Sequence, residues 1–209
     1  MHYLTNKIWF PNVNEATKEG LLAMGGDLSA ERLLLAYRNG IFPWFEMDSP
    51  ILWWSPDPRF VLFPEKLKVS KSMRQFINNT NFTITVNKDF EAVITECSKA
   101  KRAGQSGTWI TDSMIESYVK LHKLGHAKSV EAWKGSDLVG GLYGVDLNNG
   151  VFCGESMFSK ESNASKVAFI TFVQNTDYKL FDCQVYTKHL ESLGAEEIPR
   201  NAFLSYLNV

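Results

Sequence analysis

The sequence predicts an α+β fold, and three observations lead to that class. The 209 residues are 44% hydrophobic, with a formal net charge of −1, which excludes a disordered, collagenous or coiled-coil chain. From residue 80 onward, helical and strand patterns are mixed, with a three-strand meander at the centre. Six of the seven prolines lie within residues 1–64, so the first part is turn-rich. The chain therefore changes character near residue 65.

One helix is predicted in the first part. Ser29 can cap its start, Glu31 favours the positive end of the helix dipole, and Gly40 can end it. Its apolar stripe consists of Leu33, Leu34 and Tyr37.

The second part supplies a sheet and the helices that cover it. The expected strands are 82–86, 129–133, 138–147, 151–157 and 180–186. Asn148-Asn149-Gly150 is a good hairpin turn between two of them. Helices are expected at 112–124, where Gly125 stops the pattern, from an Asn163 cap to residue 173, and in a short segment ended by Gly194.

Metal and dinucleotide sites find little support in the sequence. His122 and His126 are four residues apart, but a helix that ends at Gly125 does not present both to one metal ion. The glycines of GGLYG at 140–144 lie inside a predicted strand and do not open a helix, as dinucleotide binding would require. In a strand, glycine more often marks a bulge or the close approach of another backbone. We expect neither a metal ion nor a bound dinucleotide.

The sequence also indicates a cytoplasmic, soluble protein. The longest apolar run, 167–173, is far shorter than the ~20 residues that span a bilayer. The start, MHYLTNKIWFP, lacks the apolar stretch of a signal peptide. The three widely spaced cysteines are typical of reduced thiols.

Two short segments place polar side chains among apolar neighbours. GESMFS at 154–159 ends a predicted strand and contains Glu155. DCQ at 182–184 lies inside another, where the two-residue period points Asp182 and Gln184 to the same face. A charged Asp inside a sheet is unfavourable unless it is paired or functional. A solvent-facing edge strand explains the segment about equally well.

Basic residues gather in two stretches. The first holds Arg59, Lys66, Lys68, Lys71 and Arg74, and the second holds Lys99, Lys101 and Arg102. Such runs are usually solvated surface. Beside Trp44 and Trp109, however, a basic strip would suit phosphates and a stacked base, as at single-stranded RNA ends.

Longer stretches resemble the leucyl/phenylalanyl-tRNA–protein transferase family in order along nearly the whole chain. They include GLLAMGGDLS (20–29), AYRNGIFPWF (36–45), ILWWSPDPR (51–59), LVGGLYGV (138–145), FCGESMFS (152–159), NASK (163–166), DCQV (182–185) and SLGAEEIPR (192–200). WWSPDPR, GESMFS and DCQ are the most specific of these. The resemblance implies an acetyltransferase-like (GNAT-type) α/β domain over 65–209, preceded by a small N-terminal domain over 1–64.

This resemblance implies an enzyme that transfers Leu or Phe, less often Met, from aminoacyl-tRNA to an N-terminal Lys or Arg. The modified protein would be marked for degradation through the N-end rule (N-degron) pathway. No cofactor is implied, because the tRNA ester already carries the activation. The residues that match the family's functional positions are Asp182, Gln184 and Glu155 for catalysis; Trp44 and Trp109 for the 3′ adenosine; Leu142, Phe152, Met157, Phe169 and Phe172 for the transferred side chain; and Lys66, Lys68, Lys71 and Arg74 for the tRNA backbone.

The implied chemistry is aminolysis of an ester by an α-amine, whose reference pKa near 8 leaves about a tenth as free base at neutral pH. Because an amide has negligible basicity, we expect Gln184 to accept a hydrogen bond from the incoming ammonium. Asp182 would then be the electrostatic or proton-accepting partner.

Two other functions stay open on the sequence alone. An acetyl-CoA-dependent N-acetyltransferase would need a glycine-rich pyrophosphate loop at a helix start, and 159–164 contain no glycine. A non-catalytic RNA-binding or adaptor module would not require Asp182 and Gln184.

Overall fold

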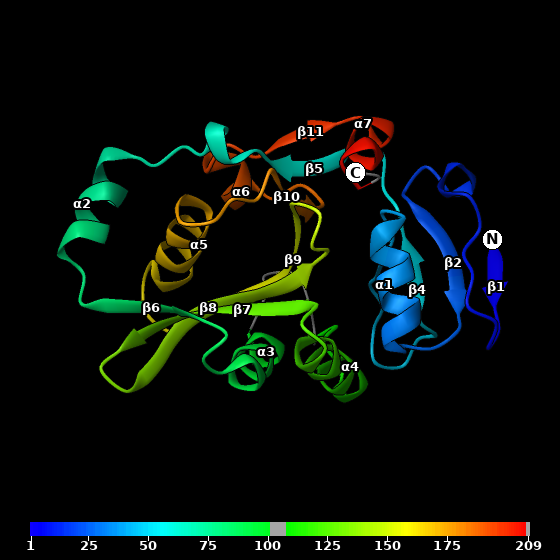
Figure 1. The fold of residues 1–209 in the computed structure, drawn as a ribbon, viewed down its shortest axis with the longest axis horizontal. Helices are drawn as coiled ribbons and strands as arrows, with labels where there is room; N and C mark the ends of the chain where they lie inside the picture. The colour runs from blue at the N-terminus through cyan, green and yellow to red at the C-terminus, as the bar shows by residue number, and fades with distance from the viewer. Residues whose placement is uncertain (101–107, 208–209) are drawn as a thin grey trace.

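In the computed structural model, which describes residues 1–100 and 108–207, two sheets and seven α-helices confirm the α+β class (Figure 1). The helices are α1 (Ala30–Arg38), α2 (Lys71–Asn79), α3 (Phe90–Lys99), α4 (Asp112–Lys123), α5 (Ala164–Gln174), α6 (Lys188–Ser192) and α7 (Arg200–Leu207). The strands are β1 (His2–Leu4), β2 (Leu21–Gly25), β3 (Phe42–Pro43), β4 (Leu52–Trp54), β5 (Arg59–Leu62), β6 (Phe82–Val86), β7 (Ala127–Lys134), β8 (Asp137–Asp146), β9 (Val151–Ser159), β10 (Leu180–Gln184) and β11 (Glu196–Ile198). None of these helices is long and apolar enough to cross a bilayer.

The larger sheet has seven strands in the order β11-β5-β10-β9-β8-β7-β6. Its neighbours are antiparallel except for β9 and β10, which run parallel. Helices α3 and α4 lie on one face and α5 on the other (Figure 1). Successive strand residues therefore enter different core clusters: Tyr143 packs with α3 and α4, whereas Leu142 packs with α5.

The central hairpins confirm the strand predictions to within a few residues. Asn148 and Gly150 both have positive φ, as the tight connection between β8 and β9 requires. Gly125, also at positive φ, follows the end of α4. Asn163 precedes α5, but its side chain makes no capping hydrogen bond, so that part of the prediction is wrong.

The glycines of the GGLYG segment serve close packing, as their position in a strand predicts. A Cβ on Gly140 would lie 2.5 Å from the Cβ of Ala164, at the start of α5. A Cβ on Gly144 would collide with the carbonyl oxygen of Cys153 on the neighbouring strand. The absence of side chains at these positions lets β9 and α5 approach β8.

Four elements that bear on the site are not predicted from the sequence. Helix α2 occupies the segment interpreted as a basic strip, and Ser70 caps it by accepting a hydrogen bond from the Met73 backbone N–H at 3.1 Å. Helix α3 is capped in the same way by Asp89. Strand β5, which the expected boundary at residue 64 assigns to the N-terminal domain, pairs with β10 and β11 of the larger sheet. The C-terminal helix α7 packs against Gly40, beyond the end of α1.

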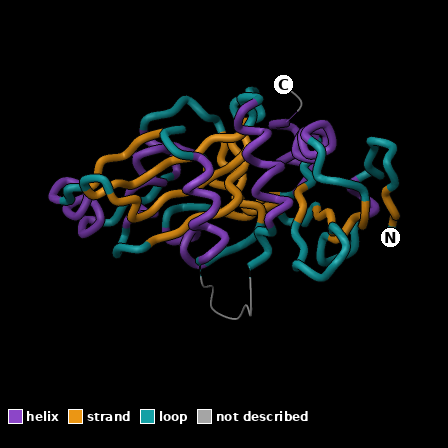
Figure 2. Tube along the Cα trace, turned by 90° about the horizontal axis from the view of Figure 1, so that it is seen from below, coloured by secondary structure: helices purple, strands orange, loops and turns teal. Residues whose placement is uncertain are grey.

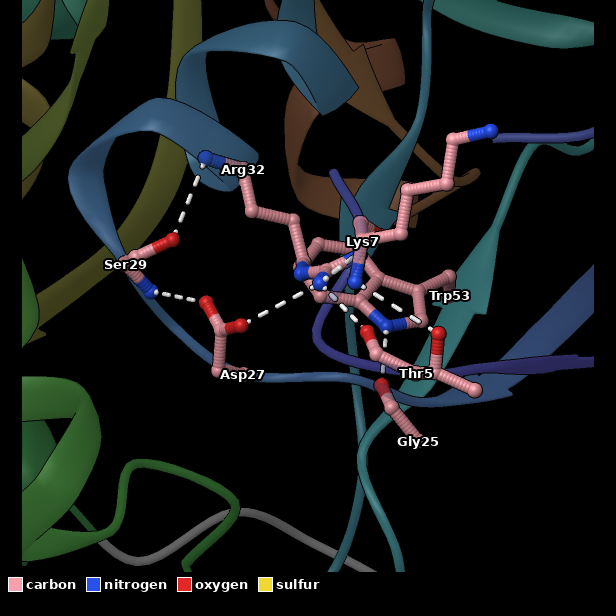
Figure 3. A network of polar contacts seen from close by, with 7 residues as sticks. All are labelled: Thr5, Lys7, Gly25, Asp27, Ser29, Arg32 and Trp53. Carbon is pink, nitrogen blue, oxygen red and sulfur yellow. Dashed lines mark hydrogen bonds and ion pairs between the residues drawn. The ribbon is translucent and has the colours of Figure 1, made fainter. Parts of the chain in front are cut away.

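The smaller sheet, β1-β2-β4-β3, lies with α1 at one end of the elongated molecule, and α2 lies at the other (Figures 1 and 2). Ser29 caps α1 as predicted, accepting from the Arg32 backbone N–H. The buried Arg32 side chain donates to the carbonyl oxygens of Thr5 at 2.7 Å and Lys7 at 3.2 Å, and pairs with Asp27 at 3.1 Å (Figure 3). This arginine therefore ties the N-terminal segment to α1.

Candidate active site

A cavity of about 360 Å³ opens where the parallel strands β9 and β10 part. Their pairing ends at Asp182 and Cys153, and beyond this point each strand exposes residues to the space between them. The segment 154–157 of β9 forms one wall, and 182–185 forms another. Residues 42–44, which comprise β3 of the smaller sheet and the residue after it, help to enclose the cavity. Crevices of this kind, at the carboxyl ends of parallel strands, commonly bind ligands.

One side of the cavity is apolar and belongs to the core cluster between the sheet and α5. Of the residues expected to receive the transferred side chain, Leu142, Phe152, Met157 and Phe169 line it. Phe172 does not: it lies behind Phe152, with ring centroids 5.0 Å apart, and supports that ring by packing. The expectation that all five residues form the wall is therefore corrected for Phe172.

Two tryptophans also line the cavity, at the positions expected for contacts with the 3′ adenosine. Trp44 follows β3 and remains 38% exposed, and Trp109 lies just before α4. The Trp54 indole N–H donates to the Trp44 carbonyl oxygen at 2.7 Å, and the two rings lie 5.8 Å apart. This contact fixes the backbone at Trp44 while its ring stays accessible for stacking.

Asp182 forms a buried ion pair at the polar end of the cavity. Arg59 of β5 donates from Nε to one carboxylate oxygen at 2.8 Å and from Nη2 to the other at 2.7 Å. Strand β10 lies between β5 and β9, so the alternative of a solvent-facing edge strand is wrong. By sequence Arg59 belongs to the first basic stretch, but it is only 1% exposed and neutralises Asp182 inside the sheet.

Gln184 adopts a backbone conformation that a strand pattern does not predict. Its φ of 65° is in the left-handed region, and the pairing with β5 shifts register between Asp182 and Gln184. The Gln184 backbone N–H donates to Asp182 Oδ1 at 2.9 Å, which holds this turn in place. This backbone conformation is strained for a residue other than glycine, and such strain indicates a functional constraint at Gln184.

Glu155 connects the two strands across the cavity. It accepts a hydrogen bond from the Gln184 side-chain amide at 2.6 Å and from the Tyr118 hydroxyl at 3.1 Å. The Tyr118 and Tyr37 hydroxyls are hydrogen-bonded to each other. Burial raises the pKa of Glu155 to about 8, although the hydroxyls and the Gln184 amide oppose the rise.

The structure thus brings the three predicted catalytic residues together, and it adds three others. The sequence pattern places Arg59 in a basic stretch and Tyr37 in the apolar stripe of the first helix. It places Tyr118 on one face of the helix expected at 112–124. Their chemistry depends on contacts between α1, α4, β5 and β10, which are distant in sequence. The one sequence feature that could have identified them is a large side chain with a polar end inside an otherwise apolar pattern.

The basic residues expected to bind the tRNA backbone fall into two groups. Lys66 forms an ion pair with Glu196 and lies 5.1 Å from the Phe63 ring. Lys68, Lys71 and Arg74 are exposed on the segment that leads into α2 and on its first turn. In the second stretch, Lys99 pairs with Glu96 at 3.3 Å, whereas Lys101 and Arg102 lie outside the described residues.

His189 lines the cavity, and its buried Nε2 has no hydrogen-bond partner among the described residues, whereas His122 has local structural contacts. His122 stacks on Phe90, with ring centroids 4.5 Å apart, and its Nδ1 lies 2.9 Å from the Ala127 carbonyl oxygen. Among residues 1–100 and 108–207, no group of three or more His, Cys, Asp or Glu residues could hold a metal ion.

Comparison with known proteins gives matches along nearly the whole chain. Residues 61–208 match the family described as leucyl/phenylalanyl-tRNA protein transferase, and residues 26–57 match its N-terminal domain. Proteins named leucyl/phenylalanyl-tRNA–protein transferase from Flavobacterium psychrophilum and Flavobacterium johnsoniae are 61% and 59% identical, each over 99% of both chains. One from Pseudomonas syringae is 51% identical over 97% of this chain and 90% of its own.

Among solved structures, a GCN5-related N-acetyltransferase from Kribbella flavida aligns with a TM-score of 0.38 and 13% identity. The alignment covers 78% of this chain and 58% of that one.

Proposed function

The chain belongs to the leucyl/phenylalanyl-tRNA–protein transferase family, and we propose that its cavity transfers Leu or Phe, and less readily Met, from aminoacyl-tRNA to an N-terminal Lys or Arg. The observation that carries the proposal is the division of one cavity into an apolar end and a polar end. In this proposal the apolar end receives the transferred side chain, and Glu155 and Gln184, which are hydrogen-bonded to each other, receive the acceptor amine.

The apolar wall supports a preference for hydrophobic side chains such as those of Leu, Phe and Met. Met157 is flexible enough to adapt to different shapes. A methylene in such a pocket changes the binding free energy by only ~1–3 kcal/mol, so a modest range of side chains is expected.

Positioning is the main contribution expected of this site. The ester is already activated, and correct placement of amine and ester supplies ~7–11 kcal/mol in good geometry. With its side-chain N–H group bonded to Glu155, Gln184 retains its amide oxygen to accept a hydrogen bond from the acceptor amine. Trp44 and Trp109 would flank the terminal adenosine at the cavity mouth.

Lys68, Lys71 and Arg74 are the proposed contacts for the tRNA backbone, with Lys66 contributing less because it is paired with Glu196. Binding through phosphates and the 3′ end would be largely independent of tRNA sequence. We further propose that the product carries a new hydrophobic N-terminus and is thereby directed to N-degron degradation in the cytoplasm.

The direct test is incubation of the protein with [³H]Phe-tRNA and a peptide that begins with Arg. We expect label to appear in the peptide, and none in the same peptide with an acetylated N-terminus. A matched peptide that begins with Glu measures the preference for a basic residue.

The same assay separates the rival functions. Labelling of the peptide from acetyl-CoA, without labelling from Phe-tRNA, would indicate an N-acetyltransferase. Binding of tRNA without any transfer would indicate an RNA-binding module and would reject the proposal.

A further inference from the structure

The acceptor amine must lose a proton during the proposed reaction, and Asp182 is poorly placed to receive it. Both of its carboxylate oxygens accept hydrogen bonds from Arg59, and one also accepts the Gln184 backbone N–H. Its side chain is 0% exposed. An amine in the cavity cannot reach a carboxylate that is fully covered and already neutralised by an arginine.

Glu155 differs from Asp182 in its exposure and in its charge partners. It is only half-buried, lies in the cavity wall and forms no ion pair with a residue in the described part of the chain. One oxygen accepts a hydrogen bond from Gln184 and the other from Tyr118, and the Tyr37 hydroxyl also helps to lower the pKa of Glu155. Because each carboxylate oxygen has two lone pairs, Glu155 can accept a further bond from an amine in the cavity.

We propose that the Glu155 carboxylate accepts the proton of the attacking α-amine and that Tyr118 is the positioning residue that holds this carboxylate in place. The proposal rests on the transferase function and deepens it. Of the two roles that the sequence left open for Asp182, electrostatic or proton-accepting, it excludes the second and leaves Asp182 the task of fixing Gln184.

The proposed step balances without another reactant. The neutral amine nitrogen bonds to the ester carbonyl carbon, and one N–H proton passes to Glu155. The bond between that carbon and the ribose oxygen then breaks, and the ribose oxygen takes the proton from Glu155. The tRNA leaves with a free hydroxyl, the peptide bond is complete, and the carboxylate is regenerated.

The surroundings of Glu155 suit proton exchange near neutral pH. Burial, aided by the charge of Asp182, raises the pKa of Glu155 to about 8, which is close to the reference pKa near 8 of an α-amine. General bases work best when their pKa lies near the working pH. The titratable and charged groups around it are Tyr37 of α1, Arg59 of β5, Tyr118 of α4, Tyr143 of β8, Cys153 of β9 and Asp182 of β10. His189 of α6 lines the same cavity, and burial lowers its pKa.

Tyr118 acts on Glu155 through its hydroxyl. Burial raises the pKa of both Tyr118 and Tyr37 well above the usual value, so both phenols remain protonated donors. A donor bonded to the carboxylate stabilises its charged form and lowers the pKa of Glu155. Loss of the Tyr118 hydroxyl should therefore raise that pKa.

The test is the pH dependence of kcat/KM for an Arg-starting peptide, from about pH 6 to about pH 9, at saturating Phe-tRNA. If both the amine and Glu155 must be deprotonated, log kcat/KM of the wild type rises with a limiting slope of about two at low pH. We expect Glu155→Gln to reduce that slope to about one and to lower kcat by ~10²-fold or more, with the KM for Phe-tRNA nearly unchanged.

Tyr118→Phe should leave the slope of log kcat/KM against pH unchanged and should move the midpoint of this pH profile to higher pH. Tyr178→Phe is the matched control, because its hydroxyl also donates to a carboxylate, that of Asp146 at 2.8 Å, away from the cavity. The midpoint of this control should equal that of the wild type.

Each outcome has a distinct meaning. A wild-type protein that transfers nothing would overturn the transferase function itself. An active wild type whose slope and rate survive Glu155→Gln would overturn the role of Glu155 as proton acceptor. A midpoint that Tyr118→Phe leaves in place, or that Tyr178→Phe moves equally, would overturn the positioning role of Tyr118.

Discussion

Arg59 and Asp182 face each other across β5 and β10 with two hydrogen bonds, at 2.8 and 2.7 Å, and neither side chain is more than 1% exposed. The Phe42 and Phe203 rings cover the guanidinium at 4.8 and 4.6 Å. The pair therefore lies in an apolar setting, where a lone charge is strongly unfavourable.

Arg59→Met should lower the free energy of unfolding by about 3–5 kcal/mol, because it leaves the Asp182 charge buried without a partner. The double variant Arg59→Met with Asp182→Leu should recover most of that loss. Urea denaturation of both variants measures the difference. Recovery of transfer activity in the double variant would contradict the assignment of Asp182 as the anchor of the Gln184 backbone.

Lys71→Ala combined with Arg74→Ala should raise the KM for aminoacyl-tRNA and flatten its salt dependence. The slope of log affinity against log salt should fall by about 0.7–0.9 for each phosphate that the variant no longer neutralises. Lys66→Ala is the control of equal charge type, and its effect should be smaller because Lys66 is paired with Glu196. A slope that stays constant in the double variant would place the tRNA-binding surface elsewhere on the protein.

The central elements could be predicted from the sequence because their signals are local. Alternation, the Asn148–Gly150 turn and the glycine after α4 specify three strands and a helix end without knowledge of the rest. The roles of Arg59 and Tyr118 could not be found in this way. Each depends on which strand or helix becomes its neighbour, and that choice is made by tertiary packing.

Gln184 shows the limit of pattern-based prediction at the site. A two-residue period places Asp182 and Gln184 on one face, yet the bulge and the left-handed φ end that period before Gln184. The two residues converge on the cavity because a side-chain-to-backbone hydrogen bond stabilises the irregular turn. The two residues therefore lie together at the cavity, as the pattern predicts, but through a geometry that differs from a regular strand.

Phe169→Ala should change the choice between Leu-tRNA and Phe-tRNA by enlarging the apolar end of the cavity. We expect the ratio of kcat/KM values to shift toward Phe by ~10-fold, equivalent to about 1.4 kcal/mol, within the range for altered hydrophobic pockets. Phe172→Leu is the control, since Phe172 lies behind Phe152 and does not line the cavity. A larger shift of the ratio in Phe172→Leu than in Phe169→Ala would contradict the finding that Phe169 lines the cavity and Phe172 does not.

The raised pKa of Glu155 also predicts how the stability of the protein depends on pH. A carboxyl group whose folded-state pKa, about 8, lies above its unfolded value near 4.5 binds a proton more tightly in the folded state. Its favourable contribution is complete below the unfolded pKa and is lost as pH rises through the folded one. The free energy of unfolding of the wild type should therefore decline between about pH 5 and about pH 9, by an amount on the order of a few kcal/mol.

Glu155→Gln removes the titrating group while keeping a side chain that can accept from Tyr118. Its free energy of unfolding should decline less over the same pH interval. The difference between the variant and the wild type should therefore shift in favour of the variant as the pH increases. Urea denaturation at about five pH values, followed by tryptophan fluorescence, gives both curves. Parallel curves for the two proteins would show that Glu155 titrates normally in the folded state, and the match between its pKa and that of the acceptor amine would then be lost.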